Sequence, residues 1–319
     1  MARWTRRPTG PRAGTEPAVD ARVSVGSVEL RSPVMTASGT AGYGTELAAS
    51  FDLSSIGAVV TKSLAAFAWD GNPAPRLHPT AQGMLNAVGL QGPGVAYWLE
   101  HVVPDLESSG ATVIASIWGR SVDDYRAAAD LLAAAPACVV AVEVNLSCPN
   151  LEGRRSIFAH DPDLSAEVVS ATAGCGRPRW AKLSANTDRI VDVASAVAEA
   201  GAEAVTCINT MLGFAYDPDT LQPSLAAGGG GLSGRAIHPV AVRAVHDVHA
   251  ALPGLAIVGV GGVASGWDAA ELLLAGASAV QVGTALFADP AAPVKIQADL
   301  LTWAHRRGIG CIDQVGALA

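Results

Sequence analysis

The residues best suited to chemistry lie where a predicted strand breaks into a loop. Segment 142–150 (VEVNLSCPN) starts as an alternating β-branched run and ends in a Pro-Asn turn, which predicts a buried strand followed by a loop. Asn145, Ser147, Cys148 and Asn150 sit at this break, and a rigid strand end beside an open loop suits side chains that must be aimed at a ligand. Cys148 by itself does not indicate a catalytic site, because most unpaired cysteines behave as small buried apolar residues.

Two lysines follow apolar, strand-like runs in a chain that otherwise uses arginine. Of 21 basic residues only Lys62, Lys182 and Lys295 are lysines, which leaves 18 arginines. Lys62 and Lys182 come directly after apolar runs. A lysine is a compact point charge on a flexible stem, unlike the planar arginine. Chance placement would explain the pair, but so would a chemical role at strand ends.

Length and composition describe a large, acidic globular chain. It has 319 residues, half of them hydrophobic, with 34 glycines, a net charge of -8 and a pI near 5.3. This size is ordinary for a single α/β barrel. The negative charge argues against nucleic acid or an anionic membrane as a partner, and solubility explains it simply.

The cysteines and the N-terminal segment bear on the compartment. Five cysteines without a C-x-x-C pair predict neither a disulfide framework nor a zinc site, and no carboxylate or His-x-x-His cluster suggests another metal. A reducing cytoplasm is therefore expected. Residues 1–20 are polar, rich in Pro and Gly, and lack the apolar core of a signal peptide, so they are expected to form a flexible tail. Residues 21–319 are expected to form one domain.

Eight apolar, strand-like runs alternate with helical patterns. The strands are predicted at 33–39, 56–62, 112–117, 139–145, 179–183, 204–209, 255–260 and 279–282, and the helices at 95–107, 122–135, 162–173, 188–200, 239–251, 268–275 and 290–306. Continuous apolar runs fit strands that are covered on both faces. Eight β/α units in about 250 residues predict a single (β/α)8 TIM barrel.

Three segments lie outside this alternation. Residues 21–31 predict an extended N-terminal extension or hairpin with Gly26 near its turn, and 63–93 and 210–235 are two long loop excursions at the carboxyl ends of the strands. Ordered loops of this length are usually functional. An open doubly wound sheet would need fewer strands and a G-x-G-x-x-G turn after the first one, and the sequence has no such turn there.

Polar residues and glycines gather at the predicted carboxyl ends of the strands, where the active site of this barrel type lies. These ends carry Ala37/Ser38, Lys62, Ser116, Asn145 to Asn150, Lys182/Ser184, Asn209/Thr210, Gly259 to Gly262 and Gly283/Thr284. Polarity that simply begins where strands end would account for Ser116 and Ser184. It accounts poorly for the charged Lys62 and Lys182.

Glycines at the seventh and eighth strand ends predict a phosphate site. The runs 259–262 (GVGG) and 282–284 (VGT) each precede a predicted helix, and the loops after these two strands hold phosphate in many such barrels. Glycine lets backbone N–H groups approach phosphate oxygens, and a helix N-terminus adds a favourable dipole. The run 228–234 (GGGGLSG) is compatible with a flexible linker or with a loop covering the cofactor.

A phosphate without a dinucleotide fingerprint favours a mononucleotide such as FMN over NAD. A lysine beside a flavin can stabilise the negative charge that develops at its N1/O2 edge on reduction. Both Lys182 and Lys62 are candidates for that role.

Several motifs together resemble the dihydroorotate dehydrogenases. They are 144–150 (VNLSCPN), 83–91 (GMLNAVGLQ), 208–210 (INT), 230–234 (GGLSG), the pair Gly261-Gly262 and 276–284 (GASAVQVGT). The motifs occur in the family's order, and the resemblance runs from about Val34 to Pro290. The segment 86–91 (NAVGLQ) and Cys148 are most similar to the soluble NAD-linked type. The membrane-bound quinone type instead has an N-terminal helical extension and a serine base.

This resemblance implies FMN-dependent oxidation of (S)-dihydroorotate to orotate in pyrimidine biosynthesis. It implies FMN contacts from Ala37, Ser38, Lys62, Ser63, Asn145, Lys182, Ile208, Gly234, Gly261, Gly262, Gly283 and Thr284. It implies substrate contacts from Lys62, Asn86, Ala87, Val88, Gly89, Leu90, Asn145, Asn150, Asn209 and Thr210. The catalytic residues would be Cys148, as the base that removes a proton from C5, and Lys62.

The resemblance also implies partners. In the NAD-linked type, electrons leave to a separate subunit that carries FAD and an iron–sulfur cluster, and the catalytic subunits often form a homodimer. This chain has no cysteine set for such a cluster, so that subunit would be a separate chain.

Some positions depart from the family pattern and leave alternatives open. Ser116 stands where the family usually has Asn, and Trp69, Trp118, Ala185 and Arg235 are also unusual. They bear on the electron acceptor, the partner subunit and the substrate. One alternative is a paralogue that acts on another dihydropyrimidine or cyclic amide in a specialised pathway. The other is a non-catalytic flavin-binding scaffold subunit.

Overall fold

The computed structural model describes residues 19–147 and 158–318. Eight parallel strands form one sheet in the order β3-β14-β13-β10-β9-β8-β7-β4. They are β3 (Val34–Thr36), β4 (Val59–Val60), β7 (Val113–Ile117), β8 (Val139–Asn145), β9 (Arg179–Lys182), β10 (Ala204–Cys207), β13 (Ala256–Val260) and β14 (Ala279–Val282). All eight strands coincide with runs predicted from the sequence.

The two end strands of this sheet approach each other. A parallel bridge joins Met35 to Ala58, just before β4, and the Gly57 amide donates to the Val34 carbonyl at 2.8 Å. The sheet is thereby nearly closed, and the predicted (β/α)8 barrel is confirmed. The strand residues are almost all buried, as expected for strands that pack inside the barrel and against helices.

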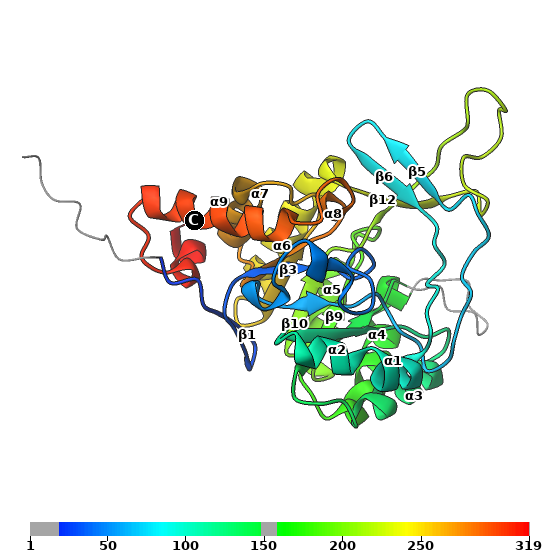
Figure 1. Ribbon diagram of the computed structural model, residues 1–319, viewed down its shortest axis with the longest axis horizontal. Helices are drawn as coiled ribbons and strands as arrows, with labels where there is room; N and C mark the ends of the chain where they lie inside the picture. The colour runs from blue at the N-terminus through cyan, green and yellow to red at the C-terminus, as the bar shows by residue number, and fades with distance from the viewer. Residues whose placement is uncertain (1–18, 148–157, 319) are drawn as a thin grey trace, which may run out of the picture.

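Helices flank the barrel (Figure 1). They are α1 (Val95–His101), α2 (Val103–Ser108), α3 (Val122–Leu132), α4 (Pro162–Ala171), α5 (Ile190–Glu199), α6 (His238–Ala251), α7 (Gly266–Leu274), α8 (Ala285–Ala288) and α9 (Ala292–Arg306). The helix predicted over 95–107 is interrupted at Val102. Pro104 explains the break, because proline has no N–H to bond back into the preceding turn. The single turn α8 was missed because it is too short to show a period.

The N-terminal extension is a hairpin. Strands β1 (Val23–Val25) and β2 (Val28–Leu30) pair antiparallel around Gly26, which has φ +59°, so the predicted hairpin is confirmed. The Ser27 amide donates to Glu203, directly before β10. The predicted tail, 1–20, falls outside the described residues except for Val19 and Asp20, and Asp20 bridges to Cys311.

The two excursions build a second sheet. Strands β5 (Leu77–Thr80) and β6 (Gly83–Asn86) come from the first excursion, and β11 (Met211–Gly213) and β12 (Gly230–Ser233) from the second. They form an antiparallel sheet in the order β11-β12-β6-β5, which we call the roof sheet and which projects from the barrel in Figure 1.

The glycine run 228–234 is therefore not a flexible linker, since part of it is the inner strand β12, and its place over the cavity agrees with the alternative of a covering segment. Its glycines allow close approach: a Cβ at Gly231 would overlap the Thr210 side chain. The sequence signal was ambiguous because glycine is common in all three settings.

Candidate active site

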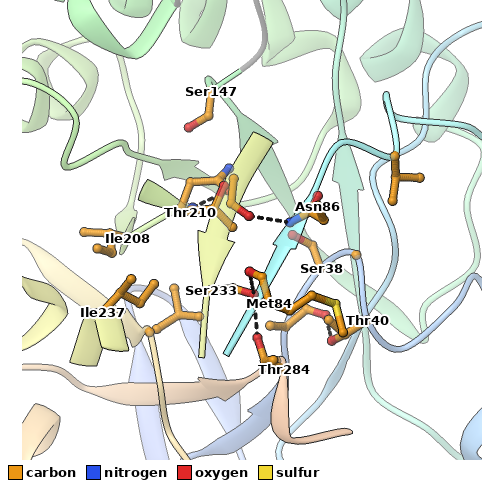
Figure 2. A pocket seen from close by; sticks show the side chains of 18 of the residues that line it. Ser38, Thr40, Met84, Asn86, Ser147, Ile208, Thr210, Ser233, Ile237 and Thr284 are labelled. Carbon is orange, nitrogen blue, oxygen red and sulfur yellow. Dashed lines mark hydrogen bonds between the residues drawn. The ribbon is translucent and has the colours of Figure 1, made fainter. Parts of the chain in front are cut away.

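A cavity of about 430 Å³ lies between the carboxyl ends of the barrel strands and the roof sheet. This volume falls within the range of about 300–1,000 Å³ that is usual for small-molecule and cofactor sites. Figure 2 shows side chains from both sides, with Ser38 and Thr284 from the barrel and Met84, Asn86 and Ser233 from the roof sheet.

The predicted site residues in the described chain meet in this cavity. Its lining includes the predicted cofactor residues Ala37, Ser38, Lys62, Ser63, Asn145, Lys182, Ile208, Gly234, Gly261, Gly262, Gly283 and Thr284, and the predicted substrate residues Asn86, Ala87, Val88, Gly89, Leu90, Asn209 and Thr210. Cys148 and Asn150 lie outside the described residues. What each residue binds remains a prediction.

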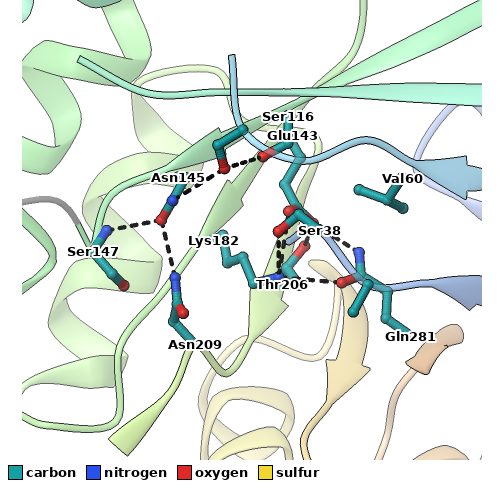
Figure 3. Close-up of polar contacts among 12 residues, drawn as sticks. Ser38, Val60, Ser116, Glu143, Asn145, Ser147, Lys182, Thr206, Asn209 and Gln281 are labelled. Atoms are coloured by element: carbon teal, nitrogen blue, oxygen red, sulfur yellow. Dashed lines mark hydrogen bonds and ion pairs between the residues drawn. The ribbon is translucent and has the colours of Figure 1, made fainter. Parts of the chain in front are cut away.

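Lys182 ends β9 and is almost fully buried, with 3% of its surface exposed. Its ammonium Nζ donates to Ser38 Oγ at 3.1 Å and Gln281 Oε1 at 3.3 Å, and lies 3.4 Å from Glu143 Oε1 (Figure 3). Four different strand regions of the barrel thus fix the position of this cation at the cavity wall.

Glu143 completes this cluster from one layer deeper in the barrel. Its Oε2 accepts hydrogen bonds from Thr206 Oγ1 at 3.1 Å and from Gln281 Nε2 at 2.7 Å. We call Glu143, Lys182, Thr206 and Gln281 the floor network. The participation of Glu143 and Gln281 in this network was not predicted, although an acid and an amide inside continuous apolar strands were an available signal.

A chain of amides and hydroxyls runs along the wall beside Lys182. The Asn209 amide donates to Asn145 Oδ1 at 3.0 Å, and Asn145 Nδ2 donates to Ser63 Oγ at 3.2 Å (Figure 3). Ser63 in turn shares a hydrogen bond with Ser116 at 2.9 Å. Ser116, unusual for the family, therefore supports this chain from behind. The contacts fix which way each amide faces the cavity.

Lys62 contrasts with Lys182. It is half-buried, and no carboxylate within 19–147 or 158–318 forms an ion pair with it. Burial, followed by the nearby Arg76 charge, lowers the pKa of the Lys62 ammonium below its ordinary value. Its nearest aromatic neighbour is the Tyr43 ring, 5.5 Å from Nζ to the centroid. An uncompensated cation at a cavity wall suits an anionic ligand.

The glycine turns after β13 and β14 leave room for a group held by the backbone. Gly261 and Gly262 have φ of +145° and +69°, and a Cβ at Gly262 would lie 2.8 Å from the Gly234 carbonyl oxygen. His238 Nδ1 contacts the Gly261 oxygen at 2.7 Å and holds the turn in place. Glycine turns that line the same cavity as Lys182 fit a phosphorylated flavin, because their main-chain amides can approach the phosphate.

The segment 86–90 is clamped through its backbone. Trp69 Nε1 donates to the Gly89 carbonyl at 3.0 Å, Asn72 Nδ2 to the Ala87 carbonyl at 2.9 Å, and Asn86 Nδ2 to the Gly231 carbonyl at 3.1 Å. Trp69 is one of the unusual residues. Its hydrogen bond gives it a structural reason to be there, because it fixes a segment that lines the cavity.

The other unusual residues lie around the cavity. Trp118 is buried beside Phe67 and Trp69, with ring centroids 6.0 and 6.2 Å apart. Ala185 is half-buried beside the core, and Arg235 is exposed near Asp268. None of these three lines the cavity.

Several lining residues were not predicted. They are mostly apolar side chains of the roof and the last strand ends: Leu77, Met84, Leu212, Ile237, Val260 and Phe287. Ser147 was noted only for its place at the strand end, and its buried hydroxyl has no hydrogen-bond partner within the described chain. Apolar residues give no sequence signal of lining a site, since the same types fill the core.

In the described parts of the chain, no group of three or more His, Cys, Asp or Glu is arranged to hold a metal ion. No helix there is long and apolar enough to cross a membrane. Cys138, Cys175, Cys207 and Cys311 are free thiols.

Comparison with known proteins gives one consistent result. A family model described as dihydroorotate dehydrogenase matches residues 21–303. A protein of Trichlorobacter lovleyi named dihydroorotate dehydrogenase B (NAD(+)), catalytic subunit, is 46% identical over 298 residues, covering 93% of this chain and 97% of its own length. Proteins of the same name from Geotalea uraniireducens and Geobacter metallireducens are 42% and 43% identical over 301 residues, covering 94% of this chain and 98% of theirs.

Proposed function

The chain belongs to the dihydroorotate dehydrogenase family of flavin-dependent oxidoreductases, and we propose that it oxidises (S)-dihydroorotate to orotate with FMN as its cofactor. The observation that carries the proposal is the cavity itself. One buried and paired lysine, one lysine without an acid partner among the described residues, a chain of oriented amides and two glycine turns surround a single space of about 430 Å³.

The barrel side of the cavity suits the cofactor. Gly261, Gly262, Gly283 and Thr284 would hold the FMN phosphate, and Lys182 would face the N1/O2 edge of the ring. Bound FMN supplies the acceptor for the hydride that leaves C6 of the substrate.

Groups from the roof sheet and from three barrel strand ends suit the pyrimidine. Asn86 on the roof sheet and Asn145, Asn209 and Thr210 at barrel strand ends offer hydrogen-bonding groups for its ring edge, and Lys62, after β4, offers a cation for its carboxylate. Oriented amides discriminate well, because an unsuitable ligand leaves them unpaired. The clamped backbone of 86–90 keeps this arrangement rigid.

The proton from C5 would go to Cys148, by resemblance to the NAD-linked enzymes. A thiol acts as a base only when ionised, and nearby positive charge favours the thiolate. Asn150 would contact the substrate beside it. Both assignments rest on the motif 144–150, because the two residues lie outside the described chain.

The partner assignment follows the relatives, which are named catalytic subunits of an NAD-linked enzyme. We propose that electrons pass to a separate subunit carrying FAD and an iron–sulfur cluster, that the catalytic chain forms a homodimer, and that it works in the cytoplasm. Co-purification of the tagged chain with such a subunit would test the first point. The co-purified complex should show the absorption bands of flavin and of an iron–sulfur cluster.

Turnover with dihydroorotate and with dihydrouracil tests the reaction. Dihydrouracil lacks the carboxylate, so an enzyme that uses Lys62 as proposed should strongly prefer dihydroorotate. Preference for dihydrouracil would favour the paralogue. The purified protein should be yellow, and a colourless protein that does not take up added FMN would contradict the cofactor assignment.

Cys148→Ala tests the base. We expect a loss of about 10²- to 10⁴-fold in kcat with FMN still bound, because general-base catalysis contributes about that much. Cys138→Ala is the matched control, since Cys138 is a half-buried thiol that does not line the cavity. Unchanged turnover in Cys148→Ala would show that Cys148 is not the base. If the unaltered protein itself has no turnover, the alternative of a non-catalytic scaffold subunit would be favoured.

A further inference from the structure

The floor network contains a carboxylate that the proposed reaction does not use. Glu143 is 0% exposed and lies on β8 two residues before Asn145. Because side chains alternate along a strand, Glu143 and Asn145 point to the same face, with Glu143 one layer deeper inside the barrel. Gln281 and Thr206 stand in the same relation to the cavity residues Gly283 and Ile208.

The contacts of Glu143 indicate an ionised carboxylate. It accepts hydrogen bonds from three donors: the Lys182 ammonium at 3.4 Å, the Thr206 hydroxyl at 3.1 Å and the Gln281 amide at 2.7 Å (Figure 3). Two of these partners, the ammonium and the amide N–H₂, can only donate, and the ammonium carries the opposite charge, so the arrangement matches an ionised carboxylate.

Stability alone does not explain the pair. Removing two charges from water costs several kcal/mol per ion, and a buried ion pair is often no more stabilising than apolar residues of the same volume. The apolar strands around it show that the barrel interior otherwise follows that rule. A buried acid and base retained directly below a proposed cofactor site therefore call for a functional reason.

We propose that Glu143 is a positioning residue that sets the reduction potential of bound FMN by holding a buried negative charge against Lys182. The inference rests on the proposed function, because it requires FMN in the cavity. It concerns a residue that does not line the cavity and acts only through Lys182.

The charge balance gives the direction. With oxidised flavin, Glu143 and Lys182 sum to zero, and two-electron reduction with uptake of one proton leaves one negative charge on the flavin and hence on the site. Without the Glu143 charge, the same reduction leaves the site neutral. Buried net charge is unfavourable, so Glu143 disfavours the reduced flavin and lowers its potential. This would help electrons leave towards a downstream acceptor.

Glu143→Gln tests this directly, because it removes the charge and keeps the size of the side chain. The reduction potential of bound FMN is measured by equilibration with a reference dye. We expect the ratio of reduced to oxidised flavin at a fixed potential to rise at least about tenfold, which is about 30 mV for a two-electron couple. An unchanged or lower potential in a folded, flavin-loaded variant would overturn the proposal.

Thr206→Val is the matched control. It removes one hydrogen bond to the same carboxylate oxygen and disturbs the same packing, but it keeps the charge. A purely structural role for the network predicts similar effects of both substitutions on the potential. The proposal predicts that the potential of Thr206→Val stays close to that of the unaltered protein.

The unaltered protein offers a second measurement if Glu143→Gln does not fold. If reduction leaves one negative charge on the site, it takes up one proton, and the potential should fall by about 30 mV per pH unit above about pH 7. A slope twice as steep would mean that reduction takes up a second proton and leaves the site neutral, which would contradict the proposal. Failure of the unaltered protein to bind FMN at all would instead refute the proposed function.

Discussion

The two sides of the cavity are built in opposite ways. On the barrel side, the polar groups of the floor network lie on four parallel strands of the barrel, are buried, and satisfy one another. On the other side, the roof sheet is made from two distant excursions, and Leu77 and Leu212 on it are 47% and 67% exposed. The barrel side is thus arranged before any ligand arrives, whereas the roof depends on strand pairing over a long sequence separation.

The two cavity lysines, both at barrel strand ends, differ in a similar way. Lys182 is paired with Glu143, so its charge is compensated inside the protein. Lys62 has no acid partner within the described chain and carries a lowered pKa, so its charge is available to a ligand. We infer that Lys182 and the glycine turns form the cofactor side of the cavity, and that Lys62 and the roof sheet form the side of the exchanging substrate. FMN affinity and substrate kinetics should therefore respond to different substitutions.

The largest effect is expected from Gly262→Ala on the barrel side. A side chain there meets the Gly234 carbonyl at 2.8 Å and must adopt φ +69°. Strain of about 1–2 kcal/mol from the backbone, with a similar amount from the overlap, should weaken FMN binding by about 30- to 1,000-fold. Fluorescence titration of the apoprotein with FMN measures it.

Gly254→Ala is the control for that experiment, because a Cβ there has no atom within 4 Å. It should bind FMN as the unaltered protein does. Normal FMN affinity in Gly262→Ala would show that this turn does not hold the phosphate.

Lys62→Ala should produce the next largest effect, on the substrate. Loss of a charge-assisted hydrogen bond of about 1.5–3 kcal/mol should lower kcat/KM for dihydroorotate by about 10- to 100-fold. Lys295→Ala is the control, since Lys295 pairs with Asp289 on the surface and should leave kcat/KM unchanged. An effect of Lys62→Ala on FMN affinity larger than that on kcat/KM would break the division between the two sides.

The lowered pKa of Lys62 adds a pH dependence. As pH rises, Lys62 loses its charge before an ordinary lysine would, so KM for the anionic substrate should begin to rise below pH 10.5, the ordinary pKa. Lys62→Arg, whose guanidinium stays charged, should abolish that rise. In the same window the unfolded chain binds more protons than the folded one, so the free energy of unfolding should increase with pH. Chemical denaturation at several pH values measures this.

The barrel was predictable because its signal is local. Each strand is a continuous apolar run, and both lysines are charges placed where such runs end. The roof sheet was not predictable in this way. Its central pairing joins Asn86 to Gly231, two residues far apart in the sequence, and its glycines are required by close contacts that no local pattern records.

The floor network shows the same limit within the barrel. Glu143 and Lys182 lie on the neighbouring strands β8 and β9, and Gln281 on β14 reaches both of them across the barrel interior. The sequence identified Lys182 as unusual but could not identify its partners. Residue types thus revealed which groups were chemically notable, and only the strand order revealed which of them touch.

Gly231→Ala tests the roof where it is most crowded. A Cβ at this position would overlap Thr210, so the Thr210 side chain must move. Overpacking of about 1–3 kcal/mol should raise KM for dihydroorotate by about tenfold while FMN affinity stays within about twofold. Gly254→Ala is again the control, because a Cβ there has no atom within 4 Å. Equal loss of FMN and substrate affinity in Gly231→Ala would show that the two sides are not independent.

The smallest effect is expected from Trp69→Phe, which keeps the aromatic packing and removes one hydrogen bond, from Nε1 to the Gly89 carbonyl. Gly89 is only partly buried, so water can replace the lost donor, and the cost should be about 0.5–1.5 kcal/mol. KM for dihydroorotate should therefore rise by about two- to tenfold, with kcat and FMN affinity nearly unchanged. Trp267→Phe, an exposed tryptophan beside Trp303, should change none of these quantities. A fall in kcat without a change in KM would instead mean that the clamp on segment 86–90 aligns the substrate for reaction more than it holds it.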